Sequence, residues 1–420
     1  MAPRCPSARR RAPTRLSAAL LLATCAACSD GATAPKPITQ LPRALTAAEQ
    51  QVISGSNDFA FGLLREIDRR SSPDANIFIS PLSASMALGM AVTGAAGSTL
   101  DSMRATLGFA GMSIDDIDAS YKSLIGLLRG LDPRVDFRLA NSIWYRQGFP
   151  VEHSFLDAGT NFFDAQIQAL DFDNPSSVET INSWVTQSTN GKIDQIVDAI
   201  PRDMMLYLIN AIYFKGTWSS QFDKAKTHPA PFHLADGSTQ QVQMMTQEDT
   251  FPAVLTPEYS AAELPYGGGA YTMVVVVPQG STTVDDLITT LDTPAWQSLL
   301  GGLTTRSGNV SIPRFELTWD DSLNAPLAAL GMGIAFDAFR ADFSGISKGG
   351  GLYISGVRQK TYVKVDEDGT VAAAATSVGM VPTSLPPALI NADRPFLFAI
   401  RERLSGTILF VGKMMKPPEA

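Results

Sequence analysis

The stretch DEDGTVAAAATSVGMVPTSLPPALINADRPF, residues 366–396, decides the fold of this chain. Gly369 and Thr370 end a strand-like run, and the four alanines that follow can form either helix or strand. The prolines further on exclude regular structure. A structureless segment of this length inside a folded domain is usually functional. The residues alone leave two interpretations open: a functional loop, or a low-complexity alanine spacer.

The rest of the chain predicts one large α+β domain over residues 46–420. No internal repeat or long linker divides it, and 45% hydrophobic residues supply a core. Thr46 and Glu49 have capping-box spacing before an amphipathic helix, and a buried helix follows Ser80-Pro81. Helices therefore dominate early and strands late, without the alternation of a doubly wound sheet. A further helix-rich segment is predicted at 181–200, and strands are predicted at 204–218, 271–278, 309–319, 352–365, 396–402 and 407–415.

The first 27 residues read as an export signal. They carry five arginines and no acidic residue, and they include an apolar run too short to anchor the protein across a membrane. The sequence CAAC resembles a bacterial lipoprotein cleavage site, in which Cys28 becomes the lipidated N-terminus; soluble secretion is the alternative. Residues 28–45 then predict a flexible tether. We expect an exported protein, lipid-anchored in the cell envelope or extracellular.

Cysteine usage and charge exclude several classes of partner. All three cysteines lie within residues 1–28, so the folded part has neither a disulfide nor a thiol nucleophile. After removal of the signal, 28 basic residues face 41 acidic ones, a net charge of −13. This charge disfavours nucleic acid and heparin as partners. We expect membrane contact only through the lipid anchor.

The sequence contains no credible active site. Ser347 lies in Gly-Ile-Ser-Lys-Gly, which has the spacing of a nucleophile elbow, but a glycine-rich turn running into a strand is the wrong context. The histidines, His153, His228 and His233, lack metal-ligand spacing, and the last two read as loop residues. Asp366 to Gly369 offers too few oxygens for calcium. We therefore expect no enzyme activity, no cofactor and no metal.

Several segments, taken together and in order, resemble the serpin family over residues 46–418. These segments are NIFISPLSASMALGMAVTGA, INSWVTQSTNGKI, LINAIYFKGTW, ADFSGIS, VDEDGTVAAAAT and NADRPFLFAIRERLSGTILFVGKM. The resemblance implies the serpin fold: three β-sheets, eight or nine helices and an exposed reactive-centre loop that a serine protease attacks. It also implies a metastable monomer that acts as a suicide-substrate inhibitor.

In that mechanism, the cleaved loop inserts as an extra strand into the main sheet and traps the acyl-enzyme. Side chains that enter the core must be small, and alternation along a strand places Thr370, Ala372, Ala374 and Thr376 on the inward face. We expect Thr370→Arg to block insertion while the exposed native loop tolerates it. From Thr370 to Thr376 the hinge carries no charge or bulk, which favours an inhibitor over a non-inhibitory binding or chaperone-like serpin. The resemblance assigns the hinge to Glu367, Gly369, Thr370, Ala372, Ala373, Ala374, Ala375 and Thr376.

The resemblance also assigns residues that control how the five-stranded native sheet opens. Ser80, Ser83 and Asn210 match the central shutter, and Gln359 stands where most members have a histidine. An amide donates and accepts hydrogen bonds as a neutral imidazole does, so the shutter network can persist. Trp218 matches the breach, where insertion begins, and it is equally typical of a core aromatic. Finally, Arg314 and Glu367 match positions that form an ion pair.

Family spacing from Glu367 places the reactive bond between Thr383 and Ser384, and counting back from Pro395 gives Ser384–Leu385 instead. A short β-branched residue after Val381-Pro382 fits the pocket of elastase-like or subtilisin-like proteases. No Arg or Lys lies between Gly369 and Asn391, so trypsin-like enzymes are not expected targets.

Overall fold

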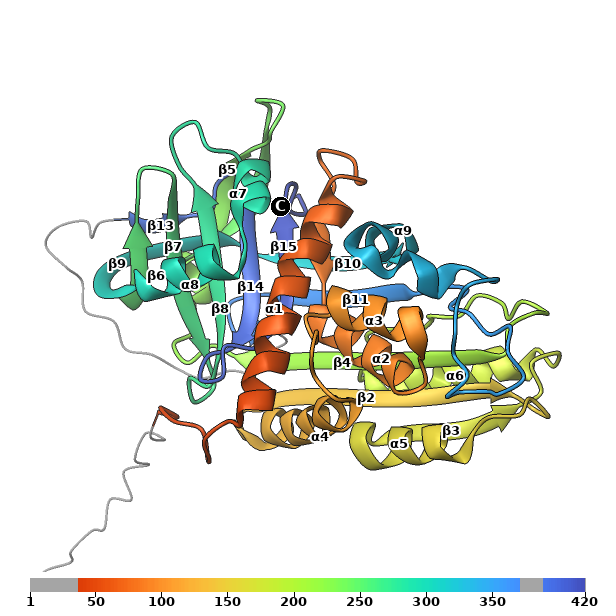
Figure 1. Cartoon of the computed structure of the whole chain (residues 1–420). Helices are drawn as coiled ribbons and strands as arrows, with labels where there is room; N and C mark the ends of the chain where they lie inside the picture. The colour runs from red at the N-terminus through yellow and green to blue at the C-terminus, as the bar shows by residue number, and fades with distance from the viewer. Residues whose placement is uncertain (1–36, 371–387, 420) are drawn as a thin grey trace, which may run out of the picture. The chain divides into compact units, whose positions relative to one another are not determined.

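The structure is a computed structural model, and it describes residues 37–370 and 388–419. These residues form nine α-helices and three β-sheets, so the predicted α+β fold is confirmed (Figure 1). Most helices come from the first half of the chain and most strands from the second. The helices are α1 (Ala47–Asp68), α2 (Pro81–Thr93), α3 (Gly97–Thr106), α4 (Ile114–Gly130), α5 (His153–Phe163), α6 (Ser176–Ser188), α7 (Val284–Thr290), α8 (Thr293–Gly301) and α9 (Asn324–Leu327).

Helix α1 begins where the sequence predicts it. Thr46 Oγ1 accepts a hydrogen bond from Glu49 N at 3.2 Å, and Glu49 Oε2 accepts one from Thr46 N at 2.7 Å. The predicted capping box is therefore present, and it satisfies backbone donors that have no partner inside the helix. The guanidinium of Arg43 binds both oxygens of Glu49, and this hydrogen-bonded pairing lowers the pKa of Glu49 to about 2.

Residues just before α1 contact the folded body. Ile38 N donates to Gly268 O at 2.8 Å, and Arg403 Nη2 donates to Ile38 O at 3.0 Å. The last part of the predicted tether is thus held by hydrogen bonds to two turns of the domain. Residues 28–36 of that tether lie outside the described residues.

The largest sheet has nine strands and carries much of the core. Its strand order is β1-β15-β14-β8-β7-β6-β9-β13, with β5 paired to β6. Every side chain of β8, β14 and β15 is buried. The strands are β1 (Ile77–Ile79), β5 (His228–His233), β6 (Thr239–Leu255), β7 (Tyr259–Tyr266), β8 (Tyr271–Pro278), β9 (Thr304–Pro313), β13 (Ala388–Asn391), β14 (Phe396–Glu402) and β15 (Ile408–Met414).

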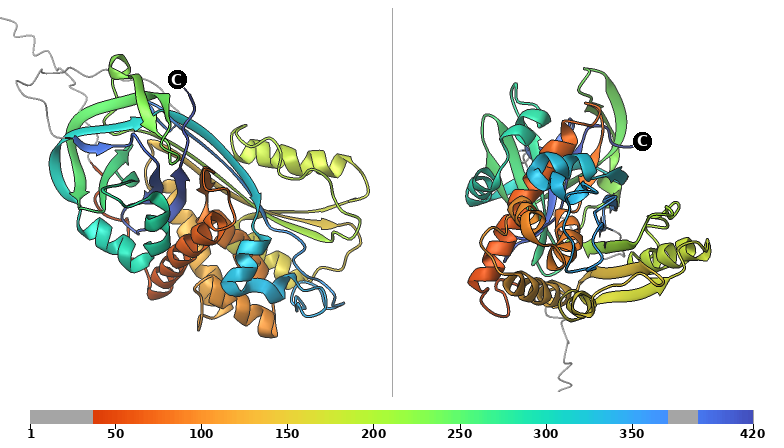
Figure 2. Two further views of the ribbon diagram at one scale, coloured as in Figure 1. Left: turned by 90° about the horizontal axis from the view of Figure 1, so that it is seen from above. Right: turned by 45° about the vertical axis from the view of Figure 1, so that its right-hand side comes forward.

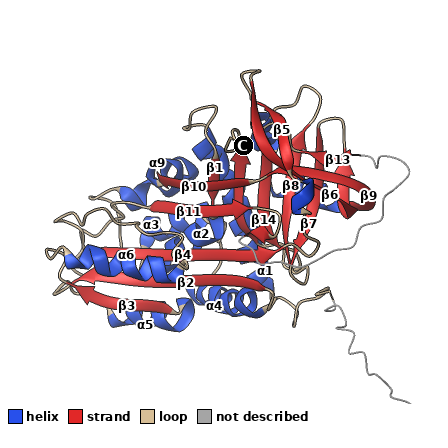
Figure 3. Ribbon diagram, turned by 180° about the vertical axis from the view of Figure 1, so that it is seen from behind, coloured by secondary structure: helices blue, strands red, loops and turns tan. Residues whose placement is uncertain are grey.

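Two smaller sheets lie side by side and position the candidate site. A four-stranded sheet has the order β12-β4-β2-β3, and β10 pairs with β11 in a two-stranded sheet. Figures 1 and 3 show β11 running next to β4. These strands are β2 (Val135–Arg146), β3 (Ala165–Leu170), β4 (Leu206–Thr217), β10 (Phe315–Ser322), β11 (Arg358–Val365) and β12 (Gly369–Thr370).

Strand boundaries differ from the sequence prediction at three places. The strand predicted over 309–319 is two strands, because the chain leaves one sheet at Arg314 and enters another. The strand predicted over 352–365 begins only at Arg358, since its partner β10 ends opposite, at Ser322. The segment containing His228 and His233, predicted as a loop, is strand β5, paired with β6.

Helix α6 ends at Ser188, although the helical pattern predicted helix-rich structure to residue 200. Asn190 and Gly191 both adopt left-handed backbone conformations, with φ of 54° and 75°. The N–H of Gly191 donates to Thr186 O at 2.8 Å, which closes the helix. The chain therefore turns and continues as an extended segment.

Helices cover both faces of the four-stranded sheet. Helices α2, α4 and α5 contact one face, and α6 lies on the opposite face (Figures 2 and 3). Helix α6 has a small apolar core of its own, in which Ile181 and Val185 pack with Trp144 of β2 and Ile209 of β4. This core is separate from the main one, which lies between the helices and sheets of the domain.

Candidate functional site

The candidate site is a slot between β4 and β11. Among the described residues no backbone ladder joins these two strands, so the continuous five-stranded sheet that the resemblance implied is not observed. A cavity of about 580 Å³ lies between them. Helix α2 lines one side of the cavity with Ser83 and Leu88, and residues 196–199, which follow α6 in the chain, line another part of it. The slot thus has two strand edges free to pair with another strand.

The hinge already occupies one end of this slot. Gly369 and Thr370 form β12 and pair antiparallel with Thr217 and Gly216 at the end of β4. The side chain of Thr370 is only 2% exposed, and its Oγ1 lies 2.8 Å from Tyr266 Oη. The expectation that Thr370 belongs to an exposed loop is therefore wrong. Thr370→Arg would place a guanidinium in the core of the native protein, where it has no partner.

The close approach of two backbones explains the glycine at 369. Its φ of 142° lies in the region that favours glycine, and a Cβ there would lie 2.2 Å from Gly216 O. Gly216 is itself constrained, because a Cβ on it would lie 2.9 Å from the ring of Tyr266. The glycine at 369 therefore lets β12 lie directly against β4, and the glycine at 216 leaves room for the ring of Tyr266.

Three consecutive acidic residues anchor the start of the hinge. Glu367 is 4% exposed, and its Oε1 accepts from Thr227 Oγ1 at 2.8 Å and lies 3.7 Å from Arg314 Nη1. The predicted Arg314–Glu367 ion pair is therefore present. Asp368 pairs with Lys224 at 2.6 Å, and this contact raises the pKa of Lys224. The neighbouring acid, Asp366, pairs with Lys364 at 3.3 Å.

We expect Glu367→Lys to open the top of the slot and promote polymerisation. The change places a second cation beside Arg314, on a side chain that is buried at position 367, and this repulsion destabilises the closed top of the slot. Native gels after mild heating should show a ladder for this variant at temperatures where the wild-type protein stays monomeric. The swapped pair Glu367→Lys with Arg314→Glu should behave more like the wild type. A variant that remains monomeric would contradict this prediction.

Trp218, predicted at the breach, contacts the residues at the start of the hinge. Its ring stacks on Tyr266 with centroids 4.3 Å apart, and its Nε1 donates to Asp366 O at 2.9 Å. Its backbone N–H donates to Asp368 O at 3.0 Å. The side chain is 4% exposed, as expected of a core aromatic, and it lies where the hinge meets β4. Its role at the breach stays a prediction.

The predicted shutter residues lie close together at the slot. Their hydrogen bonds connect the strands on its two sides to the N-terminal part of α2. Ser80 caps α2, and its Oγ donates to Leu409 O at 2.8 Å. The amide of Gln359, on β11, accepts from Ser80 N at 2.9 Å and donates to Ser80 O at 2.7 Å. Gln359 therefore uses both amide functions, as its substitution for a histidine suggested.

Helix α2 makes a longer hydrogen bond on the β4 side of the slot. Ser83 Oγ donates to Asn210 O at 3.4 Å, and Asn210 Nδ2 donates to Asn141 Oδ1 of β2 at 2.7 Å. The buried Oδ1 of Asn210, which lines the cavity, has no hydrogen-bond partner among the described residues. Polar groups of α2 thus contact both flanks of the slot.

The structure provides no catalytic constellation within the residues it describes. Ser347 is 1% exposed and lies in a turn, and the three histidines are exposed. No cluster of His, Cys, Asp or Glu suited to a metal occurs in ranges 37–370 and 388–419. The remaining sequence-predicted positions lie outside the described residues: Cys28, Ala372, Ala373, Ala374, Ala375, Thr376, Thr383 and Ser384.

Sequence analysis missed Tyr266, Thr227 and Asn141, which hold the hinge and the shutter. Glycine inside the predicted strand FKGTW was a usable signal, because glycine in a strand often marks a close approach by another group. That group is the ring of Tyr266. Nothing in the sequence around Thr227 or Asn141 distinguishes them from other polar residues.

Comparison with known proteins places this geometry in context. A family model described as "Serpin (serine protease inhibitor)" matches residues 54–417. The leukocyte elastase inhibitor of Sus scrofa is 34% identical over 382 residues, covering 88% of this chain and all of that protein. The native structure of tengpin, a thermophilic serpin, superposes with a TM-score of 0.80 at 30% identity, covering 92% and 98% of the two chains. Human thyroxine-binding globulin gives a TM-score of 0.81 at 28% identity, covering 89% and 100%.

Proposed function

The chain belongs to the serpin family, and from this premise we propose that it inhibits serine proteases by loop insertion. The protease serine attacks the carbonyl carbon of Thr383, releases the amine of Ser384 and forms an acyl ester. The freed hinge then enters the slot between β4 and β11. The observation that carries this proposal is that Gly369 and Thr370 already pair with β4 at one end of that slot.

The dimensions and lining of the slot support insertion of this particular loop. The cavity of about 580 Å³ lies between the first residues of β4 and of β11, at the end of the slot away from the hinge, and the facing edges of these strands are unpaired among the described residues. The residues that follow Thr370 on the inward face are Ala372, Ala374 and Thr376, all small. Small side chains fill such a space without the overpacking that larger ones cause.

A non-inhibitory binding role is the alternative, and the likeness to thyroxine-binding globulin favours it. That protein shares the fold and, by its name, binds a hormone. The absence of any charged or bulky residue from 370 to 376 argues for the inhibitor, because nothing in the hinge opposes insertion. Catalysis by the protein itself is not part of either proposal.

We propose that the targets are elastase-like or subtilisin-like proteases. Thr383 presents a short β-branched side chain, and Pro382 fixes the preceding backbone in an extended form, which reduces the entropy lost on docking. Export with a lipidated Cys28 would place the protein in the cell envelope, where it acts as a monomer. In the part of the chain that the structure describes, no helix combines the length and apolarity needed to span a bilayer.

Incubation with elastase, subtilisin, chymotrypsin and trypsin tests the proposal. We expect an SDS-stable covalent complex, with the highest second-order rate for elastase or subtilisin and none for trypsin. If all four enzymes cleave the loop and none forms a covalent complex, the non-inhibitory alternative is favoured. Fastest inhibition of trypsin would contradict the target class, and fastest inhibition of chymotrypsin would move the reactive bond from Thr383. Mass spectrometry of the released C-terminal peptide distinguishes Thr383–Ser384 from Ser384–Leu385.

A further inference from the structure

Strand β13 follows the reactive-centre loop in the sequence and attaches the C-terminal end of that loop to the domain. It is the outermost strand of the nine-stranded sheet, and among the described residues it pairs with β9 alone. The pairing is parallel, extends from Ala388 to Asn391 and has an irregularity between Ala388 and Ile390. An edge strand has a neighbour on one side only, so a short one is held by few backbone hydrogen bonds. Contacts at its end therefore matter for keeping it in place.

The turn after β13 is built around the carboxylate of Asp393. Asp393 Oδ2 accepts a hydrogen bond from Asn391 Nδ2 at 2.9 Å, and Asp393 Oδ1 accepts one from Arg394 Nε at 2.9 Å. Ala392 N donates to Ser311 O of β9 at 2.9 Å. The carboxylate thus fixes the last residue of β13 together with the turn that follows it.

His233, the last residue of β5, binds this turn from the neighbouring hairpin. Its backbone N–H donates to Asp393 O at 2.7 Å, and its Nδ1 lies 3.1 Å from the same oxygen. The same Nδ1 lies 4.0 Å from Asp393 Oδ2. The side chain of His233 is 54% exposed and that of Asp393 is 17% exposed, so the imidazole can exchange protons with solvent. Protonation of the ring would add an ion pair to contacts that are already present.

His233 is the member of this group of side chains that changes its charge near neutral pH. The charged side chains on the elements around it are Asp393 and Arg394 after β13, Asp236 in the β5–β6 turn and Lys416 in the C-terminal segment next to β6. A hydrogen bond from the hydroxyl of Ser238 lowers the pKa of Asp236. Aspartate, lysine and arginine keep their charges between pH 5 and 8, whereas histidine loses its charge in this range. The residue opposite His233 on β6, Thr239, is uncharged.

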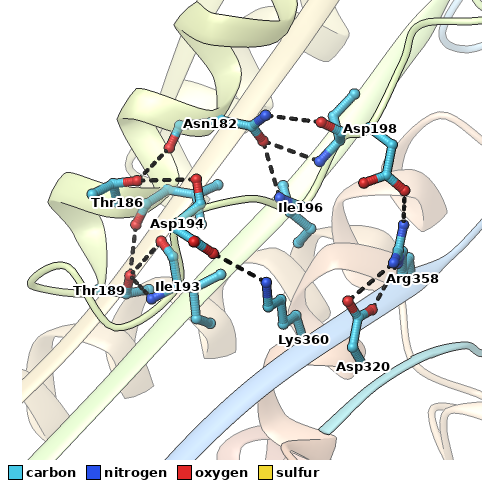
Figure 4. Close-up of polar contacts among 12 residues, drawn as sticks. Asn182, Thr186, Thr189, Ile193, Asp194, Ile196, Asp198, Asp320, Arg358 and Lys360 are labelled. Atoms are coloured by element: carbon cyan, nitrogen blue, oxygen red, sulfur yellow. Dashed lines mark hydrogen bonds and ion pairs between the residues drawn. The ribbon is translucent and has the colours of Figure 1, made fainter. Parts of the chain in front are cut away.

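The polar contacts along the slot keep their charges in the same pH range. Figure 4 shows the contacts between the segment after α6 and β11. Arg358 Nη1 lies 2.5 Å from Asp198 Oδ2, and Lys360 Nζ lies 3.2 Å from Asp194 Oδ1. The hydrogen bond from Lys360 lowers the pKa of Asp194, and the hydrogen bond to Asp320 raises the pKa of Arg358. Both shifts favour the charged forms, so an effect of pH on the loop is expected at its β13 end.

We propose that protonation of His233 strengthens the attachment of β13 and thereby slows the entry of the uncleaved loop into the slot. The proposal rests on the loop insertion proposed above and adds a control by pH. An uncleaved loop is attached at both ends, so it can enter fully between β4 and β11 only after β13 has left β9. The imidazolium of His233 attracts the carboxylate of Asp393 and holds the turn in place. As the pH rises through the histidine range, the ring loses its charge and this attraction is lost.

The test compares His233→Gln with the matched control His228→Gln at about pH 5 and about pH 8. Glutamine keeps a hydrogen-bond donor and carries no charge. His228 lies at the other end of β5, is also exposed, and has its Nδ1 2.9 Å from the carbonyl oxygen of Lys226. Hydrogen exchange of the backbone N–H groups of residues 389–394, measured by mass spectrometry on the full-length protein, reports detachment of β13. Each variant is compared with the wild type at the same pH, so the intrinsic exchange rate cancels.

At about pH 5, the wild type and His228→Gln should exchange these N–H groups about twofold to fivefold more slowly than His233→Gln, because exposed ion pairs are weak. At about pH 8 all three proteins should exchange alike. When Asp393→Asn has removed the carboxylate, His233→Gln should have no further effect at either pH. Equal exchange by the wild type and His233→Gln at about pH 5 would overturn the proposal. A difference of the same size at both pH values would also overturn it, because it would indicate a role for the ring that does not depend on charge.

The consequence for the loop is measured on protein that has not met a protease. During incubation at a raised temperature, the uncleaved wild type should convert to the inserted form about twofold to fivefold more slowly at about pH 5 than at about pH 8. The inserted form is recognised by its higher thermal midpoint. The dependence on pH should persist in His228→Gln and disappear in His233→Gln, and a wild-type rate that is equal at both pH values would overturn the link to insertion. If hydrogen exchange follows the charge of His233 and no inserted form appears, the inhibitory function is contradicted while the pH-dependent attachment of β13 is confirmed.

Discussion

Cleavage of the loop at Thr383–Ser384 is expected to raise the thermal midpoint of the protein by tens of degrees. The measurement is calorimetry or circular dichroism of intact and cleaved protein under the same conditions. Domains of 150–250 residues shift by about 2–4 °C per kcal/mol, so a shift of this size requires a gain on the order of 10 kcal/mol.

The slot can supply a gain of this order. An inserted strand would bury apolar surface of its own and of the cavity of about 580 Å³, and each Å² of apolar surface removed from water contributes about 25 cal/mol. New backbone hydrogen bonds along β4 and β11 add to it, at about 1 kcal/mol each. The native protein lacks this gain only because an uncleaved loop remains tethered at both ends. Its stability is therefore kinetic.

If the cleaved and the intact protein have the same thermal midpoint, this expectation is contradicted and the non-inhibitory alternative is favoured. The control is the same cleavage in a variant whose hinge cannot enter the slot. Such a variant should show no increase in midpoint, which separates insertion from any effect of the nick itself.

Ala374→Arg is expected to provide that variant and to turn the inhibitor into a substrate. An unpaired guanidinium on the inward face costs several kcal/mol of desolvation, which slows insertion by a factor of about 100 or more. The protease then completes hydrolysis before it is trapped. SDS gels should show cleaved protein and no covalent complex, while the thermal midpoint of the intact variant stays unchanged.

Ala374→Ser is the matched control, because it keeps the side chain small and uncharged. It should still form the complex. Undiminished trapping by Ala374→Arg would refute the inward assignment of this residue. Position 374 replaces Thr370 for this test, since Thr370 is already buried against Tyr266 and an arginine there would disturb the uncleaved protein.

Local patterns predicted the elements that depend on nearby residues. The capping box at Thr46 and Glu49, the buried helix after Ser80 and the hydrophobic strands near the C-terminus all form as expected. Predictions failed where a distant partner decides the outcome. Strand β11 starts at Arg358 because β10 ends opposite it, and the segment with His228 becomes a strand because β6 lies alongside.

The order of the motifs in the sequence determined the family, and the resemblance to that family predicted the pairing of Arg314 with Glu367. The sequence also shows that the hinge residues expected to face inward are small, and their insertion stays a prediction. Only the tertiary structure decided that Thr370 is already paired with β4, and that a slot lies open between β4 and β11. An isolated Asp194 or Asp198 reads as a solvated surface charge. Its partner lies on β11, more than a hundred residues away, and only the folded chain brings the two together.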